Sequence, residues 1–168
     1  SIENCETMDI MRGEEAEIFG ILEHLNIDGQ ALIVLPGSHS KFVAIDSEKR
    51  ITGCITTLAG ELLSVITNNT ILSDALNNSF VKDINEKFII QGARYSNDVG
   101  LNRACFTVRI LDQFTKYTAN EKANFLLGAV FIEDIKAIKN SGALKVQPDI
   151  PLIIGGGSNL RKAFEILI

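Results

Sequence analysis

The chain has 168 residues, of which 46% are hydrophobic and 22% charged, a balance that is ordinary for a folded domain and argues against disorder. Sixteen basic residues against 21 acidic ones give a formal net charge of −5 without a stripe of lysine and arginine, so a nucleic-acid partner is not expected. No apolar run approaches a membrane span, and the first residues are acidic where a signal peptide would be basic, which predicts a cytoplasmic protein with no membrane partner.

The first predicted element is a helix over about residues 14–25, because Ile18 and Leu22 continue a spacing of four that begins at Glu14. Glu14 and Glu15 place two carboxylates at the helix start, where the helix dipole keeps them ionised. An ionised carboxylate can accept the proton of a substrate hydroxyl during phosphoryl transfer. Acids at a helix start are also common solubilising residues, but the spacing turns Glu14 toward the buried face.

Three strand-like runs follow, over residues 31–35, 41–46 and 51–57. The two connections are short enough for hairpins, and we therefore expect a three-stranded antiparallel meander.

The first hairpin connection, PGSHSK at residues 36–41, has the composition of a phosphate-binding loop. Gly37 lets the backbone approach an anion, Ser38 and Ser40 offer hydroxyls, and Lys41 offers a positive charge. His39 could donate to a phosphate or simply fill the turn. The pattern suggests a kinase or an ATPase, although it lacks the longer glycine loop of the Walker motif. The alternative is an ordinary hairpin turn in which Ser38 satisfies a backbone amide.

The middle of the chain predicts mainly helices. Gly60-Glu61 opens one, and Glu61 could hold a magnesium-bound water or a substrate hydroxyl, although acids in a first turn need no such role. Residues 72–98 are rich in polar side chains and suggest a helical surface insertion. A helix is expected from Leu101, and Thr118 with Glu121 forms a capping box for a further helix that is buried over its first turns.

The C-terminal part predicts a short buried strand over residues 151–154, followed by Gly155-Gly156-Gly157-Ser158 and a helix. Strand, glycine turn and helix is a geometry typical of nucleotide sites, because the free amides at the helix start attract phosphate. The alternative is a tight turn in which Ser158 caps the helix.

Five segments, taken in order, resemble the 2-dehydro-3-deoxygalactonokinases, which are sugar-acid kinases of the actin-like, hexokinase-like ATPase superfamily. The segments are MRGEEAEIFG (11–20), LPGSHSKFV (35–43), AGELLSVI (59–66), FIIQG (88–92) and IIGGGSNL (153–160). This chain has Ser38, Phe42 and Ala59 where family members usually have threonine, tryptophan and threonine, and these changes are mild.

The resemblance implies roles for these residues. Glu14, and less firmly Glu15, would be the catalytic base, and the loop of Gly37, Ser38, His39, Ser40 and Lys41 would be a phosphate loop. Adenosine would bind at Gly155, Gly156, Gly157 and Ser158. Arg12 and Glu61 would support the groups that contact the substrate and magnesium. The reaction would transfer the γ-phosphoryl group of ATP, with Mg²⁺ and no direct metal ligand from the protein, to 2-dehydro-3-deoxy-galactonate or a close sugar acid.

All of these matches belong to the second lobe of a two-lobed kinase, since the Asp-x-Gly-Ser/Thr motif of a first lobe is absent from the 168 residues. The expected fold is a single α/β domain over residues 1–168 with an RNase H-like, actin-like ATPase core. It comprises the meander, a parallel strand, flanking helices and the insertion at 72–98. The missing first lobe is the expected partner, a homodimer is left open, and the isolated lobe should turn over poorly. The alternative function is a nucleotide-binding or assembly module of the same superfamily.

Overall fold

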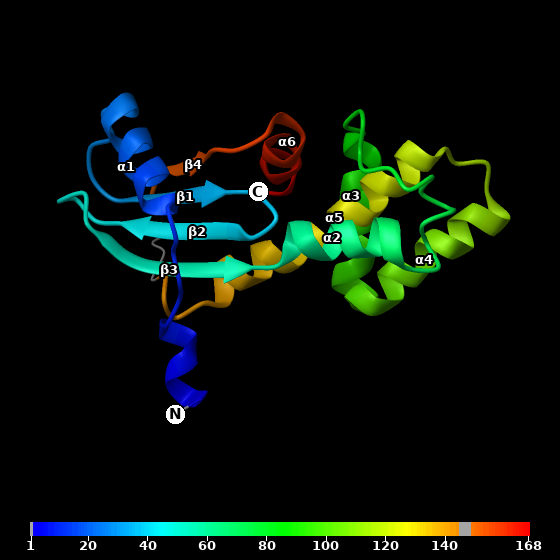
Figure 1. Ribbon diagram of the computed structural model, residues 1–168, viewed down its shortest axis with the longest axis horizontal. Helices are drawn as coiled ribbons and strands as arrows, with labels where there is room; N and C mark the ends of the chain where they lie inside the picture. Colours follow the sequence, from blue (N-terminus) through cyan, green and yellow to red (C-terminus); the bar gives the residue numbers. More distant parts are fainter. Residues whose placement is uncertain (1, 145–148) are drawn as a thin grey trace.

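A four-stranded mixed sheet forms one half of the molecule in the computed structural model, which describes residues 2–144 and 149–168 (Figure 1). Its order is β3-β2-β1-β4, with β1 antiparallel to β2, β2 antiparallel to β3, and β4 parallel to β1. The strands are β1 (Ala31–Leu35), β2 (Ser40–Ile45), β3 (Ile51–Thr57) and β4 (Leu152–Ile154). The prediction of an α/β fold with an antiparallel meander and an added parallel strand is therefore confirmed.

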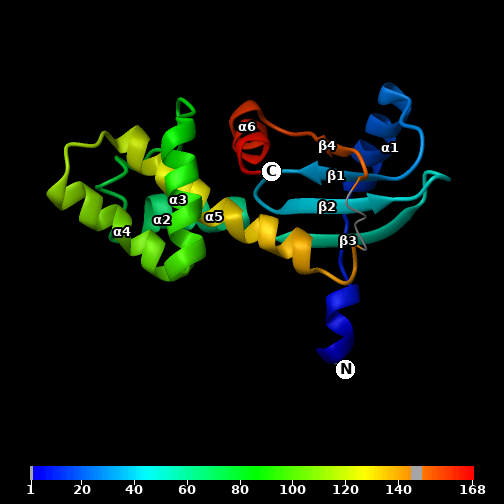
Figure 2. The same ribbon diagram turned by 180° about the vertical axis from the view of Figure 1, so that it is seen from behind.

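Helices cover both faces of this sheet, as the two opposite views show (Figures 1 and 2). On one face, α1 (Glu14–Leu25) buries Ile18 and Leu22 against alternate side chains of β1 and β2. On the other face lie α5 (Ala119–Asn140) and α6 (Ser158–Leu167). There the ring centroid of Phe164 is 5.9 Å from that of Phe42 and 4.5 Å from that of Phe131. The alternation of side chains along each strand thus separates two cores.

The other half of the molecule is helical and consists of α2 (Ala59–Asn69), α3 (Glu86–Val99), α4 (Leu101–Phe114) and the first half of α5. The long helix α5 joins the two halves, because its last turns lie under the sheet (Figure 2). α3 and α5 cross with their backbones in contact: a Cβ on Gly92 would lie 1.9 Å from the Phe125 carbonyl oxygen, and one on Gly128 would lie 2.0 Å from that of Ile89. Only glycine fits at these two positions.

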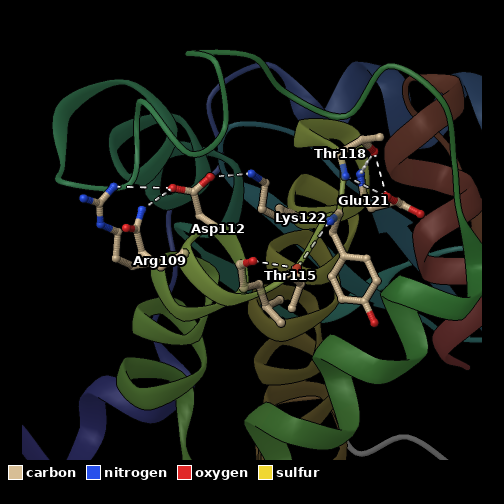
Figure 3. A network of polar contacts seen from close by, with 9 residues as sticks. Arg109, Asp112, Thr115, Thr118, Glu121 and Lys122 are labelled. Carbon is tan, nitrogen blue, oxygen red and sulfur yellow. Dashed lines mark hydrogen bonds and ion pairs between the residues drawn. The ribbon is translucent and has the colours of Figure 1, made fainter.

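The corner between α4 and α5 is fixed by the predicted capping box and by ion pairs (Figure 3). The Thr118 hydroxyl accepts from the Glu121 amide, and the Glu121 carboxylate accepts from the Thr118 amide. The buried Lys122 ammonium lies 2.7 Å from Asp112, which also faces Arg109 at 3.5 Å. The hydrogen bond that Lys122 donates to Asp112 holds the pKa of that carboxyl below its usual value, so it stays ionised.

Residues 72–98 differ from the predicted polar surface insertion. Leu72, Leu76 and Val81 are buried in the main core, and the helix α3 begins only at Glu86, with the Asn85 side chain capping it. The apolar residues of this segment therefore close the core through turns. The short 3-10 helix η1 (Ile2–Thr7) was not predicted. Among the described residues, no helix is long and apolar enough to cross a bilayer.

Candidate active site

The candidate phosphate loop, the glycine turn and the start of α2 lie together where β1 and β4 end. β1 and β4 are parallel, so the loop after Leu35 and the glycine turn after Ile154 leave the sheet side by side. A Cβ on Gly156, whose φ is +83°, would lie 2.8 Å from the Pro36 carbonyl oxygen. A Cβ on Gly60 would lie 2.1 Å from the Gly37 carbonyl oxygen. Glycine at these positions allows the loop to pack against both the glycine turn and the start of α2.

A pocket of about 320 Å³ lies on the α2 side of the loop and is called here the loop–α2 pocket. The loop is tied to α2 at its floor, because the Glu61 amide donates to the Ser38 carbonyl over 2.8 Å. The lining combines the loop backbone, hydroxyl and amide side chains of α2, and two apolar side chains. The lining residues are Gly37, Ser38, Gly60, Ser64, Thr67, Asn68, Phe80 and Leu160.

A larger cleft of about 910 Å³ lies on the other side of the loop and is called here the Glu14 cleft. It brings the segment before α1 together with the start of β2 and the end of β3. Its walls carry both acidic and basic side chains, and the basic ones include His39 of the loop. The lining residues are Cys5, Met8, Asp9, Ile10, Arg12, Glu14, His39, Lys41 and Thr56.

Lys41 organises the floor of the Glu14 cleft and is only 5% exposed. Its ammonium group donates to the Ile10 carbonyl and, over 2.9 Å, to the Thr56 hydroxyl. The same nitrogen lies 3.8 Å from Glu14 Oε1 and 4.0 Å from Asp9 Oδ1. Lys41 thus points to the α1 face of the sheet, where it faces two carboxylates.

Glu14 is the first residue of α1, and its carboxylate is prepared to stay ionised. Its Oε2 accepts from the Arg12 amide over 2.6 Å. That amide, followed by the amide of Glu14 itself and by Lys41, lowers the pKa of Glu14 below its ordinary value of 4.5. Glu15 Oε2 instead accepts from the Gly13 amide over 2.7 Å. Of the two acids, only Glu14 lines the cleft.

The exposed part of the loop carries Ser38 and His39. His39 Nε2 lies 2.8 Å from Glu61 Oε2, so the imidazole joins the loop to the first turn of α2. Both side chains are about half exposed, at 50% and 56%, and an ion pair in such a place contributes about 1 kcal/mol or less. The pair therefore orients the loop more than it stabilises the fold.

Ser40 is fully buried, and its side chain points to the opposite face from Lys41, as alternation along β2 requires. Thr57 is its partner across the sheet, and both hydroxyls stand beside the carboxylate of Asp134 on α5. Burial raises the pKa of Asp134 to about 6, although the two hydroxyls act in the opposite direction. Among the described residues, Ser40 Oγ, Thr57 Oγ1 and Asp134 Oδ2 have no hydrogen-bond partner.

The glycine turn also differs in detail from its non-functional interpretation. α6 begins at Ser158 with Gly157 as its N-cap residue, so Ser158 does not cap the helix. Gly155, Gly156 and Gly157 connect β4 to α6 beside Pro36. Adenosine binding at Gly155 to Ser158 and phosphate binding at Gly37 to Lys41 stay predictions.

Three site residues were missed from the sequence: Asp9, Thr56 and Asp134. Asp134 lies between Phe131 and Ile135, which are buried in the core. An acid on the buried side of a helix is the signal that could have revealed it. Asp9 and Thr56 give no comparable signal. No group of three or more metal-ligating side chains occurs within residues 2–144 and 149–168.

Three comparisons with known proteins agree on one family. The family model of 2-keto-3-deoxy-galactonokinase matches residues 1–165. A probable 2-dehydro-3-deoxygalactonokinase of Rhizobium meliloti strain 1021 is 43% identical over 68 residues, which are 40% of this chain and 22% of that protein. The crystal structure of a protein from Sinorhizobium meliloti, provisionally named a 2-dehydro-3-deoxygalactonokinase, superposes with a TM-score of 0.77 at 25% identity.

The structural match covers 94% of this chain but 51% of the solved one, so the chain spans about half the length of that relative. The match to the family model extends over nearly all of the sequence, and it includes the loop, the Glu14 segment and the glycine turn. The chain therefore belongs to the 2-keto-3-deoxy-galactonokinase family.

Proposed function

We propose that the chain is the second lobe of a cytoplasmic kinase that transfers the γ-phosphoryl group of ATP to a hydroxyl of a 2-keto-3-deoxy sugar acid. The supporting observation is that one loop, Gly37 to His39, borders two cavities of different character. The loop–α2 pocket lies on one side, and the Glu14 cleft with its base and cations lies on the other. Phosphoryl transfer needs such a loop between donor and acceptor.

In this proposal the nucleotide binds on the side of the loop–α2 pocket and the glycine turn. The loop backbone and the Ser38 hydroxyl hold phosphate oxygens. Magnesium bound with the nucleotide would neutralise phosphate charge, and Glu61, whose amide donates to the Ser38 carbonyl, would hold one of its waters. Ser40 and Lys41 anchor the end of the loop from the two faces of the sheet.

The sugar acid binds in the Glu14 cleft. The attacking hydroxyl forms a bond to the γ-phosphorus, the bond to the β,γ-bridging oxygen breaks, and Glu14 takes the hydroxyl proton. Arg12 is exposed at the cleft wall and forms no ion pair among the described residues, so its guanidinium is available to the substrate carboxylate. The first lobe completes the site from the opposite side.

The test uses the full-length protein with ATP and the sugar acid. Glu14→Gln should lower kcat by about 10²- to 10⁴-fold while the nucleotide Kd changes by less than a few-fold, since only proton transfer is lost. Glu23→Gln, at an exposed position of the same helix, is the matched control and should leave both unchanged. Activity kept by Glu14→Gln would remove the base from the proposal. A wild-type protein that binds ATP without phosphorylating a sugar acid would favour the assembly module.

A further inference from the structure

Two neighbouring residue pairs at the ends of β2 and β3 face opposite sides of the sheet. Lys41 and Thr56 are partners across the sheet and face the Glu14 cleft, where both are hydrogen-bonded. Ser40 and Thr57, one step further, face α5. Ser40 directly follows the loop, and Thr57 lies two residues before the start of α2, which the loop contacts. The second pair therefore sits directly behind the candidate phosphate loop.

The group that faces this second pair is a carboxylate in an apolar environment. Asp134 is 2% exposed, and its neighbours Phe131 and Ile135 on α5 are part of the core. A buried carboxylate lowers stability unless hydrogen bonds or charges compensate it, and apolar side chains of similar volume usually serve a core better. The nearby acid Glu133 adds repulsion and not compensation. The requirements of the fold therefore do not account for an acid at this position.

The unpaired atoms show what the acid can do. Ser40 Oγ and Thr57 Oγ1 each carry one proton to donate, and Asp134 Oδ2 is an acceptor without a donor, all three buried and without partners in the described part of the chain. Two hydroxyl donors and one carboxylate match each other in number and kind. Both hydroxyls already lie close enough to Asp134 to lower its pKa, although none of the three atoms has a partner within hydrogen-bond distance among the described residues. Shortening these contacts would form both bonds, and it would move the strand ends and the attached loop toward α5.

We propose, on the basis of the kinase function above, that Asp134 is a positioning residue that draws the ends of β2 and β3 against α5 through Ser40 and Thr57, and so sets the loop for phosphoryl transfer. Asp134 does not touch substrate or nucleotide in this arrangement. It acts through the two hydroxyls on the backbone between Leu35 and Ser40.

Activity and loop order are measured separately in the full-length protein. Asp134→Leu and Ser40→Ala should each lower kcat at least ten-fold, with the KM for the sugar acid within two-fold of wild type. Without nucleotide, both variants should speed hydrogen exchange of the Glu61 amide, which donates to the Ser38 carbonyl, at least ten-fold. The melting temperature of each variant should fall by no more than that of the control variant described below. The reason is that neither substitution removes a charge that is paired in the fold.

Thr107→Val is the matched control, since Thr107 is buried on α4 and its hydroxyl donates to the Arg103 carbonyl of the same helix. It should change neither kcat nor the exchange of the Glu61 amide. The double variant Asp134→Leu/Ser40→Ala should be no worse than Asp134→Leu alone, because the serine acts through the carboxylate. Asp134→Asn, which keeps one acceptor oxygen, should lie between wild type and Asp134→Leu, and it carries the test if Asp134→Leu does not fold.

Exchange and kcat within two-fold of wild type in Asp134→Leu, or in Asp134→Asn if Asp134→Leu does not fold, would overturn the proposal. So would equal losses in Thr107→Val, or losses that follow the melting temperature, since either would indicate a purely structural role. If the wild-type protein phosphorylates no sugar acid, the proposed function fails, and the exchange measurement still decides whether Asp134 positions the loop.

Discussion

The two sides of the sheet at the ends of β2 and β3 treat polar groups in opposite ways. On the cleft side, Lys41 and Thr56 are hydrogen-bonded, and Lys41 faces Glu14 across 3.8 Å. On the α5 side, Ser40, Thr57 and Asp134 have buried oxygen atoms without partners among the described residues. One strand pair thus carries a hydrogen-bonded network that stabilises the fold and, one residue further, a buried carboxylate that lowers its stability. Proteins usually keep a destabilising group of this kind at a functional site.

Removing the cation of the cleft side should have the largest effect on stability. Lys41→Met leaves Asp9 and Glu14 without the cation that both face, and the Ile10 carbonyl without its donor, and we expect the free energy of unfolding to fall by about 3 to 5 kcal/mol. Urea denaturation of the chain measures this change. Lys162→Met, at an exposed position of α6, is the control and should change it by less than about 0.5 kcal/mol. A loss below about 1 kcal/mol for Lys41→Met would show that the cleft network is not stabilising.

Neutralising the acid of the other side should have the opposite sign. The pKa of Asp134 is raised from 3.8 to about 6 in the folded state. Between these two pH values the folded state binds more protons than the unfolded state, so the free energy of unfolding falls as pH rises from 3.8 through about 6. Asp134→Asn should therefore increase the free energy of unfolding by about 2 to 3 kcal/mol at neutral pH and by nothing below the unfolded pKa. Urea denaturation at several pH values gives the difference. A variant that is less stable than wild type at neutral pH would contradict the assignment of a costly carboxylate.

The two adjacent threonines allow the comparison to be made with one substitution. Thr56 accepts from Lys41 and donates to Asp9 over 2.6 Å, so Thr56→Val should cost about 1 to 2 kcal/mol of unfolding free energy. Thr57 Oγ1 has no partner within hydrogen-bond distance among the described residues and only eases the burial of Asp134, so Thr57→Val should cost less, below about 1 kcal/mol. Thermal unfolding of the two variants side by side is the measurement. Equal effects would mean that the two faces do not differ as described.

The smallest expected effect is a shift in a titration. Because amides and Lys41 lower the pKa of Glu14, its carboxyl should titrate below pH 4.5, and the stability that it adds should be lost as pH falls through that value. In Lys41→Met the midpoint should move upward while the amide contribution remains. Carbon-13 NMR of the glutamate carboxyl groups gives the midpoint. An unchanged midpoint would show that Lys41 does not act on Glu14.

Much of the fold could be predicted because local signals agreed with the tertiary structure. The spacing of apolar residues gave α1, and the run lengths gave the meander with boundaries within one residue. The capping box at Thr118 was visible because it depends on two side chains three residues apart. The parallel strand β4 followed from a short apolar run next to glycines. In each case the information lies within a few residues along the chain.

The rest depends on contacts between distant segments. Leu72, Leu76 and Val81 lie among polar residues, and only the packing of the turns on α5 makes them core. The neighbours of Lys41 in the loop suggest a phosphate role, which stays a prediction, but they do not show that its ammonium reaches the Ile10 carbonyl 31 residues away. Asp134 is 94 residues from Ser40 in sequence, so their approach could not be read from either segment.

The glycine crossing of α3 and α5 has a mechanical consequence. With backbone against backbone at Gly92 and Gly128, no side chain can yield between the two helices, so the crossing fixes them against each other. Asp134 lies further along the same α5, on its buried side. We therefore expect α3 and α5 to move together, so that any displacement of the helical half would be carried along α5 to Asp134.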